Sequence, residues 1–212
     1  MAKAAIFDFD GTLVDSEPLY DKHLRMILED AKIDFEIDIA ATHGAGIVGT
    51  VQTWKKSYPG KADWDEIGRE FLGRFHTICM QAPFFPGAVS LLESISGNLP
   101  TAICSNSPKK NILDGLAAKD AQKYFQKFIA IEDVLKGKPA PDPYLKACAE
   151  LGFAPRECVA VEDSTTGLLS AKSAGCKVVI FNSNEYPASK LSQADLVVES
   201  WEEITPSLLK EI

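Results

Sequence analysis

The stretch AAIFDFDGTL, residues 4–13, places two aspartates at the end of an apolar run. A nearly continuous apolar run over 3–8 is typical of a strand that is buried on both faces of a parallel sheet. Asp8 and Asp10 share one face of this strand, about 6.6 Å from each other at about 3.3 Å per residue. Because an apolar interior does not accept unpaired charge, we expect other groups to be arranged to receive these two carboxylates.

The composition argues against several classes of protein. The chain has 212 residues and a net charge of −8 without a cluster of Lys and Arg, so nucleic acid is not an expected partner. We find no signal peptide and no apolar stretch near the roughly 18 residues of a membrane span, so no membrane association is expected. Five cysteines without C-x-x-C spacing indicate buried thiols in a reducing compartment. We therefore expect a cytoplasmic protein, and nothing in the sequence demands more than a monomer.

Short apolar runs alternate with helical patterns along most of the chain. The expected strands are 3–8, 100–104, 128–131, 157–161, 176–181 and 195–198. In the helix pattern DPYLKACAELG, Asp142 is the expected N-cap and Gly152 follows the last turn; SPKKNILDGL starts in the same way at Ser107, and STTGLLSAKSAG ends at Gly175. This alternation predicts an α/β fold with a doubly wound, Rossmann-like parallel sheet.

Residues 17–84 interrupt the alternation and have a helical pattern throughout. Over 64–79 the apolar residues follow helical spacing closely, and the same spacing occurs earlier, from Leu19 to Ala31. We therefore predict an all-helical cap domain over 17–84, inserted into an α/β core domain formed by 1–16 and 85–212.

Polar side chains follow three of the predicted strands. Ser105 and Asn106 come after the second strand, and Glu162 and Asp163 come after the fourth, with Lys138 between them in KGKPAPDPY. In open α/β sheets, binding sites form outside the carboxyl ends of the strands. The two aspartates of the first strand would therefore meet two further acids, a hydroxyl and an ammonium in one crevice.

This collection of side chains predicts phosphoryl transfer. Clustered carboxylates repel unless a cation neutralises them, and Mg²⁺ prefers hard oxygen ligands. Ser105 and Lys138 would hold the oxygens of a phosphate group. One aspartate could then attack phosphorus, while the other protonates the departing oxygen and later activates water.

The motifs also resemble those of a known family. DFDGT at 8–12, Ser105 in CSNS, Lys138 in KGKPAPDPY and the acid pair in VEDSTTG resemble, in order and spacing, the four motifs of the haloacid dehalogenase superfamily. DGTLVDSEP and KPAPDPYL resemble its β-phosphoglucomutase-like branch, which is rich in small-metabolite phosphatases. The resemblance covers the whole chain, and the helical insert after the first motif is similar to the helical cap of this family.

The resemblance implies a role for each matched residue. Asp8 would be the nucleophile and a metal ligand. Asp10 would be the general acid and base, and its main-chain carbonyl would also bind Mg²⁺. Asp163 would be a further metal ligand, and Glu162 would bind the metal directly or through water.

The remaining matched residues would bind the substrate. Ser105 and Lys138 would hold the transferring phosphoryl group, and Asn106 would support the leaving-group side. Of the three histidines, His43 is the best candidate for substrate contact, because it lies in the glycine-rich stretch THGAGIVG inside the insert.

We therefore predict a Mg²⁺-dependent phosphatase that hydrolyses small phosphorylated metabolites, sugar phosphates among them, through an aspartyl-phosphate intermediate. A sugar phosphomutase of the β-phosphoglucomutase type is the alternative. Such mutases typically carry a His on the first cap helix and a basic residue in the cap loop, whereas this chain has Tyr20 near the first place and only His43 near the second. A non-catalytic ligand sensor is a third hypothesis, from another class of protein.

Overall fold

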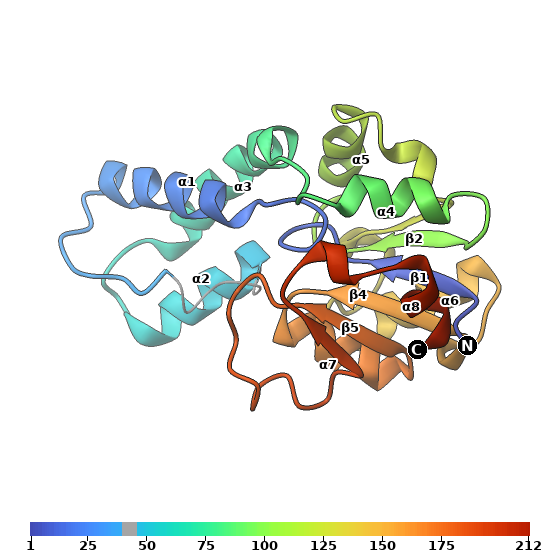
Figure 1. The fold of residues 1–212 in the computed structure, drawn as a ribbon. Helices are drawn as coiled ribbons and strands as arrows, with labels where there is room; N and C mark the ends of the chain where they lie inside the picture. The colour runs from blue at the N-terminus through green and yellow to red at the C-terminus, as the bar shows by residue number, and fades with distance from the viewer. Residues whose placement is uncertain (40–45) are drawn as a thin grey trace.

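A parallel sheet of six strands forms the centre of the structure, a computed structural model that describes residues 1–39 and 46–212 (Figure 1). Its strands are β1 (Ala4–Phe7), β2 (Thr101–Cys104), β3 (Lys127–Ile129), β4 (Cys158–Glu162), β5 (Lys177–Phe181) and β6 (Leu196–Val198). They lie in the order β3-β2-β1-β4-β5-β6, and each neighbouring pair is parallel. The strand order reverses next to β1, as in a doubly wound fold, so the fold class predicted from the sequence is confirmed.

Helices cover both faces of the sheet. Alternate residues of a strand point to opposite faces, so Ala4 and Ile6 of β1 pack in a cluster with α6 (Asp142–Leu151) and α7 (Thr165–Ala174). Phe7 packs in a second cluster with α4 (Ala88–Ile95), α5 (Lys109–Ala117) and α8 (Pro206–Glu211). Short 3₁₀ helices occupy Gln122–Tyr124, Ile131–Asp133, Pro155–Glu157 and Trp201–Glu203. Burial on both faces explains why the strands are apolar almost throughout.

Among the described residues, three helices lie between β1 and α4, to one side of the sheet in Figure 1: α1 (Glu17–Asp30), α2 (Gly46–Ser57) and α3 (Trp64–Gln81). Side chains from all three, among them Leu24, Trp54 and Ile78, pack in a cluster of their own. Phe75 and Cys79 of α3 instead join the cluster beside the sheet. The helical character expected of this insert is therefore present, and α3 connects it to the sheet.

Two predicted helix ends are confirmed and two helix starts differ. Gly152 and Gly175 end α6 and α7 with φ angles of +82° and +93°, as glycine C-caps do. Asp142 is the first residue of α6 and not its cap, because the N-cap position falls on the preceding proline. Ser107 does not cap α5 either. The extended backbone of Pro108, with ψ 138°, delays the helix to Lys109 and leaves Ser107 one residue too far away.

No helix in the described part of the chain is long and apolar enough to cross a membrane. All five cysteines are buried free thiols.

Candidate active site

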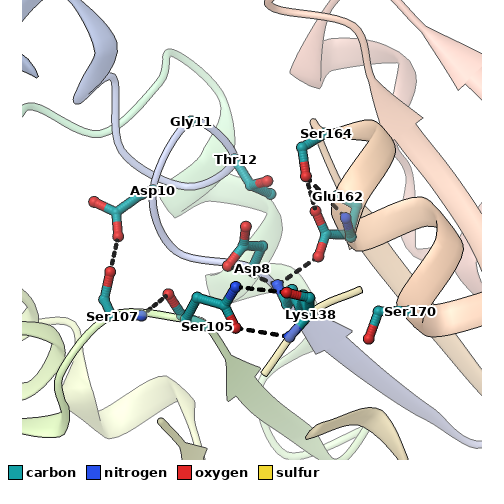
Figure 2. A network of polar contacts seen from close by, with 12 residues as sticks. Asp8, Asp10, Gly11, Thr12, Ser105, Ser107, Lys138, Glu162, Ser164 and Ser170 are labelled. Atoms are coloured by element: carbon teal, nitrogen blue, oxygen red, sulfur yellow. Dashed lines mark hydrogen bonds and ion pairs between the residues drawn. The ribbon is translucent and has the colours of Figure 1, made fainter. Parts of the chain in front are cut away.

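The carboxyl ends of β1, β2 and β4 open into a cavity of about 220 Å³. Asp8 follows β1, Ser105 follows β2 and Glu162 ends β4, and Figure 2 shows their side chains gathered around Lys138. The cavity is lined by the sheet edge on one side and by α1, α2 and α3 on the other. The predicted crevice therefore exists, and the inserted helices form part of its wall.

Three buried carboxylates lie together in this site. Asp8, Glu162 and Asp163 each offer one oxygen, and these oxygens lie within 4.8 Å of one another. The pKa of Asp8 is raised from 3.8 to about 7, because burial and the charge of Glu162 raise it more than Lys138 lowers it. Burial and the charges of Asp8 and Glu162 also raise the pKa of Asp163 well above its usual range. Such a group favours the binding of a proton or a cation, and a divalent metal fits a donor set made only of carboxylate oxygens.

The ammonium of Lys138 balances part of this charge. Lys138 Nζ lies 2.5 Å from Glu162 Oε1 and 3.0 Å from Asp8 Oδ1. Glu162 is fully buried, and its Oε1 also accepts a hydrogen bond of 2.6 Å from Tyr144 Oη. The phenol ring of Tyr144 lies beside the same ammonium, 5.3 Å from Nζ to the ring centroid. Glu162 and Tyr144 together therefore hold Lys138 next to Asp8.

The main chain of Lys138 is fixed by Asn106. The Asn106 amide donates to the Lys138 carbonyl at 3.1 Å, and the Lys138 N–H donates back to Asn106 Oδ1 at 2.9 Å. Asn106 also lines the cavity. This reciprocal pair joins the end of β2 to the loop that carries the lysine.

Asp10 lies apart from the three-carboxylate group. Its Oδ2 accepts a hydrogen bond of 2.5 Å from Ser107 Oγ, and the Ser107 N–H donates to Ser105 Oγ at 3.0 Å (Figure 2). Its Oδ1 is buried and has no hydrogen-bond partner among the described residues. Burial raises the pKa of Asp10, and the hydrogen bond from Ser107 opposes this. Ser107, which the sequence pattern assigned to a helix cap, therefore belongs to the site.

Asp163 is held by groups outside the predicted set. Thr12 Oγ1 and Asn184 Nδ2 each donate to its carboxylate at 2.8 Å. Gly11, with φ +72°, passes so close that a Cβ there would lie 2.3 Å from Asp163 Oδ2. Thr12 belongs to the DFDGT motif, whereas Asn184 lies in the loop after β5 and carries no signal in the sequence.

Six of the predicted residues line the cavity: Asp8, Asp10, Ser105, Asn106, Lys138 and Asp163. Glu162 forms an ion pair with Lys138. His43 lies outside the described residues. Sequence reasoning missed Tyr144, Ser107 and Asn184. For Ser107 the available signal was a second hydroxyl two residues after Ser105.

Comparisons with known proteins place the chain in a family. Residues 5–181 match the family model described as haloacid dehalogenase-like hydrolase. The chain is 33% identical to hexitol phosphatase A of Escherichia coli (strain K12), over 96% of this chain and 93% of that protein. The phosphoglycolate phosphatase of the same strain is 29% identical, over 97% of this chain and 92% of that protein. The crystal structure of a putative β-phosphoglucomutase from Thermotoga maritima is similar with a TM-score of 0.73 and 28% identity, covering 100% of both chains.

The chain therefore belongs to the haloacid dehalogenase-like hydrolase family. The fold agrees with that membership, and the expected family is confirmed.

The packing of Glu162 against α7 generates a first prediction. A Cβ at Gly167 would lie 2.0 Å from the Glu162 carboxyl carbon and from both of its oxygens. We expect Gly167→Ala to lower the free energy of unfolding by about 1–3 kcal/mol, because overpacking displaces the buried carboxylate. This is opposite to the usual gain from alanine in a helix. Chemical denaturation measures it.

Gly73→Ala is the matched control, since Gly73 lies in α3 and a Cβ there meets no atom of the described residues within 4 Å. That variant should gain about 0.5–1 kcal/mol. A gain at both positions would contradict the tight placement of Glu162.

Proposed function

We propose that this chain is a Mg²⁺-dependent phosphatase of small phosphorylated metabolites that works through an aspartyl-phosphate intermediate. The observation that carries the proposal is the position of Asp8, which lies 3.0 Å from the ammonium of Lys138, belongs to the group of three buried acids and lines the cavity. A carboxylate there can face an incoming phosphorus atom while the ammonium of Lys138 offsets part of its charge. The names of two relatives suggest the kind of substrate: a phosphorylated hexitol has an uncharged leaving group, whereas the leaving group of phosphoglycolate carries a carboxylate.

The acid group fits a divalent metal. Asp8 and Asp163 would hold Mg²⁺, together with the main-chain carbonyl of Asp10 and with Glu162 directly or through water. When bound, the ion would neutralise the carboxylates and withdraw charge from the phosphoryl oxygens. The raised pKa values of Asp8 and Asp163 support this proposal, because they record carboxylates whose negative charge is not fully compensated by the protein.

In the first half-reaction, an Asp8 oxygen attacks phosphorus and the bond from phosphorus to the ester oxygen breaks. Lys138 and Ser105 hold the phosphoryl oxygens. Burial lowers the pKa of Lys138, but the charges of Asp8 and Glu162 outweigh it and keep the ammonium protonated. Asp10 gives its proton to the departing oxygen, and burial favours the neutral, proton-carrying form of Asp10.

In the second half-reaction, Asp10 takes a proton from a water molecule. The water oxygen attacks phosphorus, the bond from phosphorus to Asp8 breaks, and inorganic phosphate leaves. The two carboxylates return to their starting states, so Asp10 serves first as acid and then as base.

We further propose that residues 17–84 act as a cap on a core of 1–16 and 85–212. The insert contributes Tyr20, Leu24, Phe71 and Phe75 to the cavity wall. A cap of this kind excludes water and contacts the leaving group, so that it can select among substrates. Asn106 would face the leaving-group side, and His43 remains a sequence-based candidate for substrate contact.

Phosphate release from p-nitrophenyl phosphate tests the proposed function, with Mg²⁺ and with a chelator. We expect Asp8→Asn to lower kcat/KM by about 10³-fold or more, since an amide cannot serve as the nucleophile. Asp142→Asn is the matched control, because Asp142 begins α6 and lies outside the cavity lining. Full activity of Asp8→Asn would rule out the mechanism. Isomerisation of a sugar phosphate without net phosphate release would favour the phosphomutase.

The hydrogen bond from Ser107 to Asp10 generates a prediction about the leaving group. Ser107→Ala should lower kcat/KM for an alkyl phosphate by about tenfold, because the alkoxide needs the proton of a well-oriented Asp10. The loss for p-nitrophenyl phosphate should be about threefold or less, because that weakly basic oxygen leaves without a proton. Ser107→Thr keeps a hydroxyl and should restore the alkyl phosphate rate. Equal losses for both substrates would mean that Ser107 has only a structural role.

The pKa of Asp8 predicts how metal binding depends on pH. The pKa is raised from 3.8 to about 7 in the folded protein, so the metal-free protein is most stable while Asp8 is protonated and loses stability as the pH rises through this range. Mg²⁺ should therefore raise Tm more at about pH 8 than at about pH 5, where it competes with a proton. Thermal unfolding with Mg²⁺ and with EDTA measures this difference. Asp163→Asn should remove most of the gain, and an equal gain at both pH values would contradict the assignment.

A further inference from the structure

The side of the cavity formed by α1, α2 and α3 is mostly apolar among its described residues. Glu17 and Asp21 of α1 and Thr50 of α2 also lie on this side. The apolar side chains come from all three helices, and we call them the apolar wall: Leu24, Ile47, Val48, Phe71, Leu72 and Phe75. Hydrocarbon groups therefore form much of the cavity surface away from the sheet edge.

One part of the apolar wall is buried and closely packed. Leu24, Phe71 and Phe75 are each at most 3% exposed. The ring of Tyr20, which also lines the cavity, lies 5.4 Å from the rings of both Phe71 and Phe75, measured between centroids. Rings packed in this way hold their positions, so this part of the wall is already formed before a substrate binds.

The other part of the apolar wall includes exposed side chains. Val48 is 71% exposed and Leu72 is 52% exposed, and both line the cavity. A ligand that covers such side chains with hydrocarbon gains binding free energy, because it removes apolar surface from water. Hydroxyl groups placed against the same side chains would lose their hydrogen bonds to water and gain none from the wall. The wall therefore favours a hydrocarbon surface over a polyol.

The phosphoryl end of the site decides which part of a substrate meets the wall. Asp8, Ser105 and Lys138 at the sheet edge would hold the phosphoryl group. The ester oxygen joins this group to the leaving group, so the leaving group extends from the sheet edge into the rest of the cavity. The apolar wall is thus continuous with the proposed active site, and the leaving group is the occupant that can reach it.

We infer that the chain selects phosphate esters whose leaving group presents an alkyl or aryl surface over esters of polyhydroxylated alcohols, and that Val48 and Leu72 determine this specificity. The inference rests on the proposed function and names its substrate class.

Two matched pairs of substrates test this preference in the Mg²⁺-loaded protein. Hexyl phosphate is compared with sorbitol 6-phosphate, and cyclohexylmethyl phosphate with glucose 6-phosphate. Within each pair the size is similar and the ester oxygen is on a primary carbon. The hydrocarbon member should have a kcat/KM about tenfold higher or more, a ratio that one or two additional methylene contacts can supply. Its more basic leaving oxygen acts against this result, so chemistry alone would not produce it.

Making the exposed part of the wall polar should reduce the preference. In the double variant Val48→Thr, Leu72→Gln we expect the ratio within each pair to fall about fivefold or more, through a lower kcat/KM for the hydrocarbon member. Met80→Gln is the matched control, because Met80 is a 39% exposed apolar residue of α3 outside the cavity lining. It should leave both ratios unchanged.

The remaining outcomes would overturn the inference. An equal loss of kcat/KM for both members of a pair in the double variant would mean that Val48 and Leu72 contact another part of the protein during turnover and not the leaving group. An unchanged ratio would mean that they do not contact the substrate.

p-Nitrophenyl phosphate separates failure of this inference from failure of the proposed function. If the wild-type chain hydrolyses this ester with Mg²⁺ but uses sorbitol 6-phosphate as well as hexyl phosphate or better, the inferred preference is wrong and the phosphatase stands. If neither this ester nor any of the four substrates releases phosphate, the proposed function is wrong and the inference falls with it.

Discussion

The ion pair of Lys138 with Asp8 and Glu162 is the interaction on which the rest of the site depends. An ammonium and two carboxylates are buried together at the end of the sheet. Lys138 Nζ lies 3.0 Å from Asp8 Oδ1 and 2.5 Å from Glu162 Oε1. Removing one partner from such a group leaves a buried charge uncompensated, at a cost of about 3–5 kcal/mol. The surrounding residues serve to keep the group complete: Tyr144 donates to Glu162, and Asn106 holds the lysine main chain.

The sheet could be predicted from the sequence because both of its faces are buried. That burial makes the four central strands, β2, β1, β4 and β5, short apolar runs between helices, whereas β3 and β6 at the sheet edges are only partly buried. The main candidate residues could be predicted for a related reason. Parallel strands bring their carboxyl ends to one edge, so Asp8, Ser105 and Asp163 meet wherever the strands pair.

The supporting residues could not be predicted because they reach the site only through tertiary contacts. Tyr144 has the position of a core residue in an amphipathic helix, and its hydroxyl matters only because β4 brings Glu162 beside it. Ser107 precedes a proline and so resembles a helix cap. Its hydroxyl instead donates a hydrogen bond to the carboxylate of Asp10, 97 residues away in the chain. Asn184 lies in a loop that no pattern marks.

The pairing of β1 with β4 has a consequence for how the chain acquires its function. Thr12 and Asp163, which hydrogen-bond at the centre of the acid group, are 151 residues apart. Closing so long a loop is entropically costly and comes late when contacts are non-local. A growing or shortened chain that ends before β4 would have the two leading aspartates but neither Glu162 nor Asp163 beside them. The acid group therefore assembles only after β4 has joined the sheet, which links its chemistry to the pairing of β1 with β4.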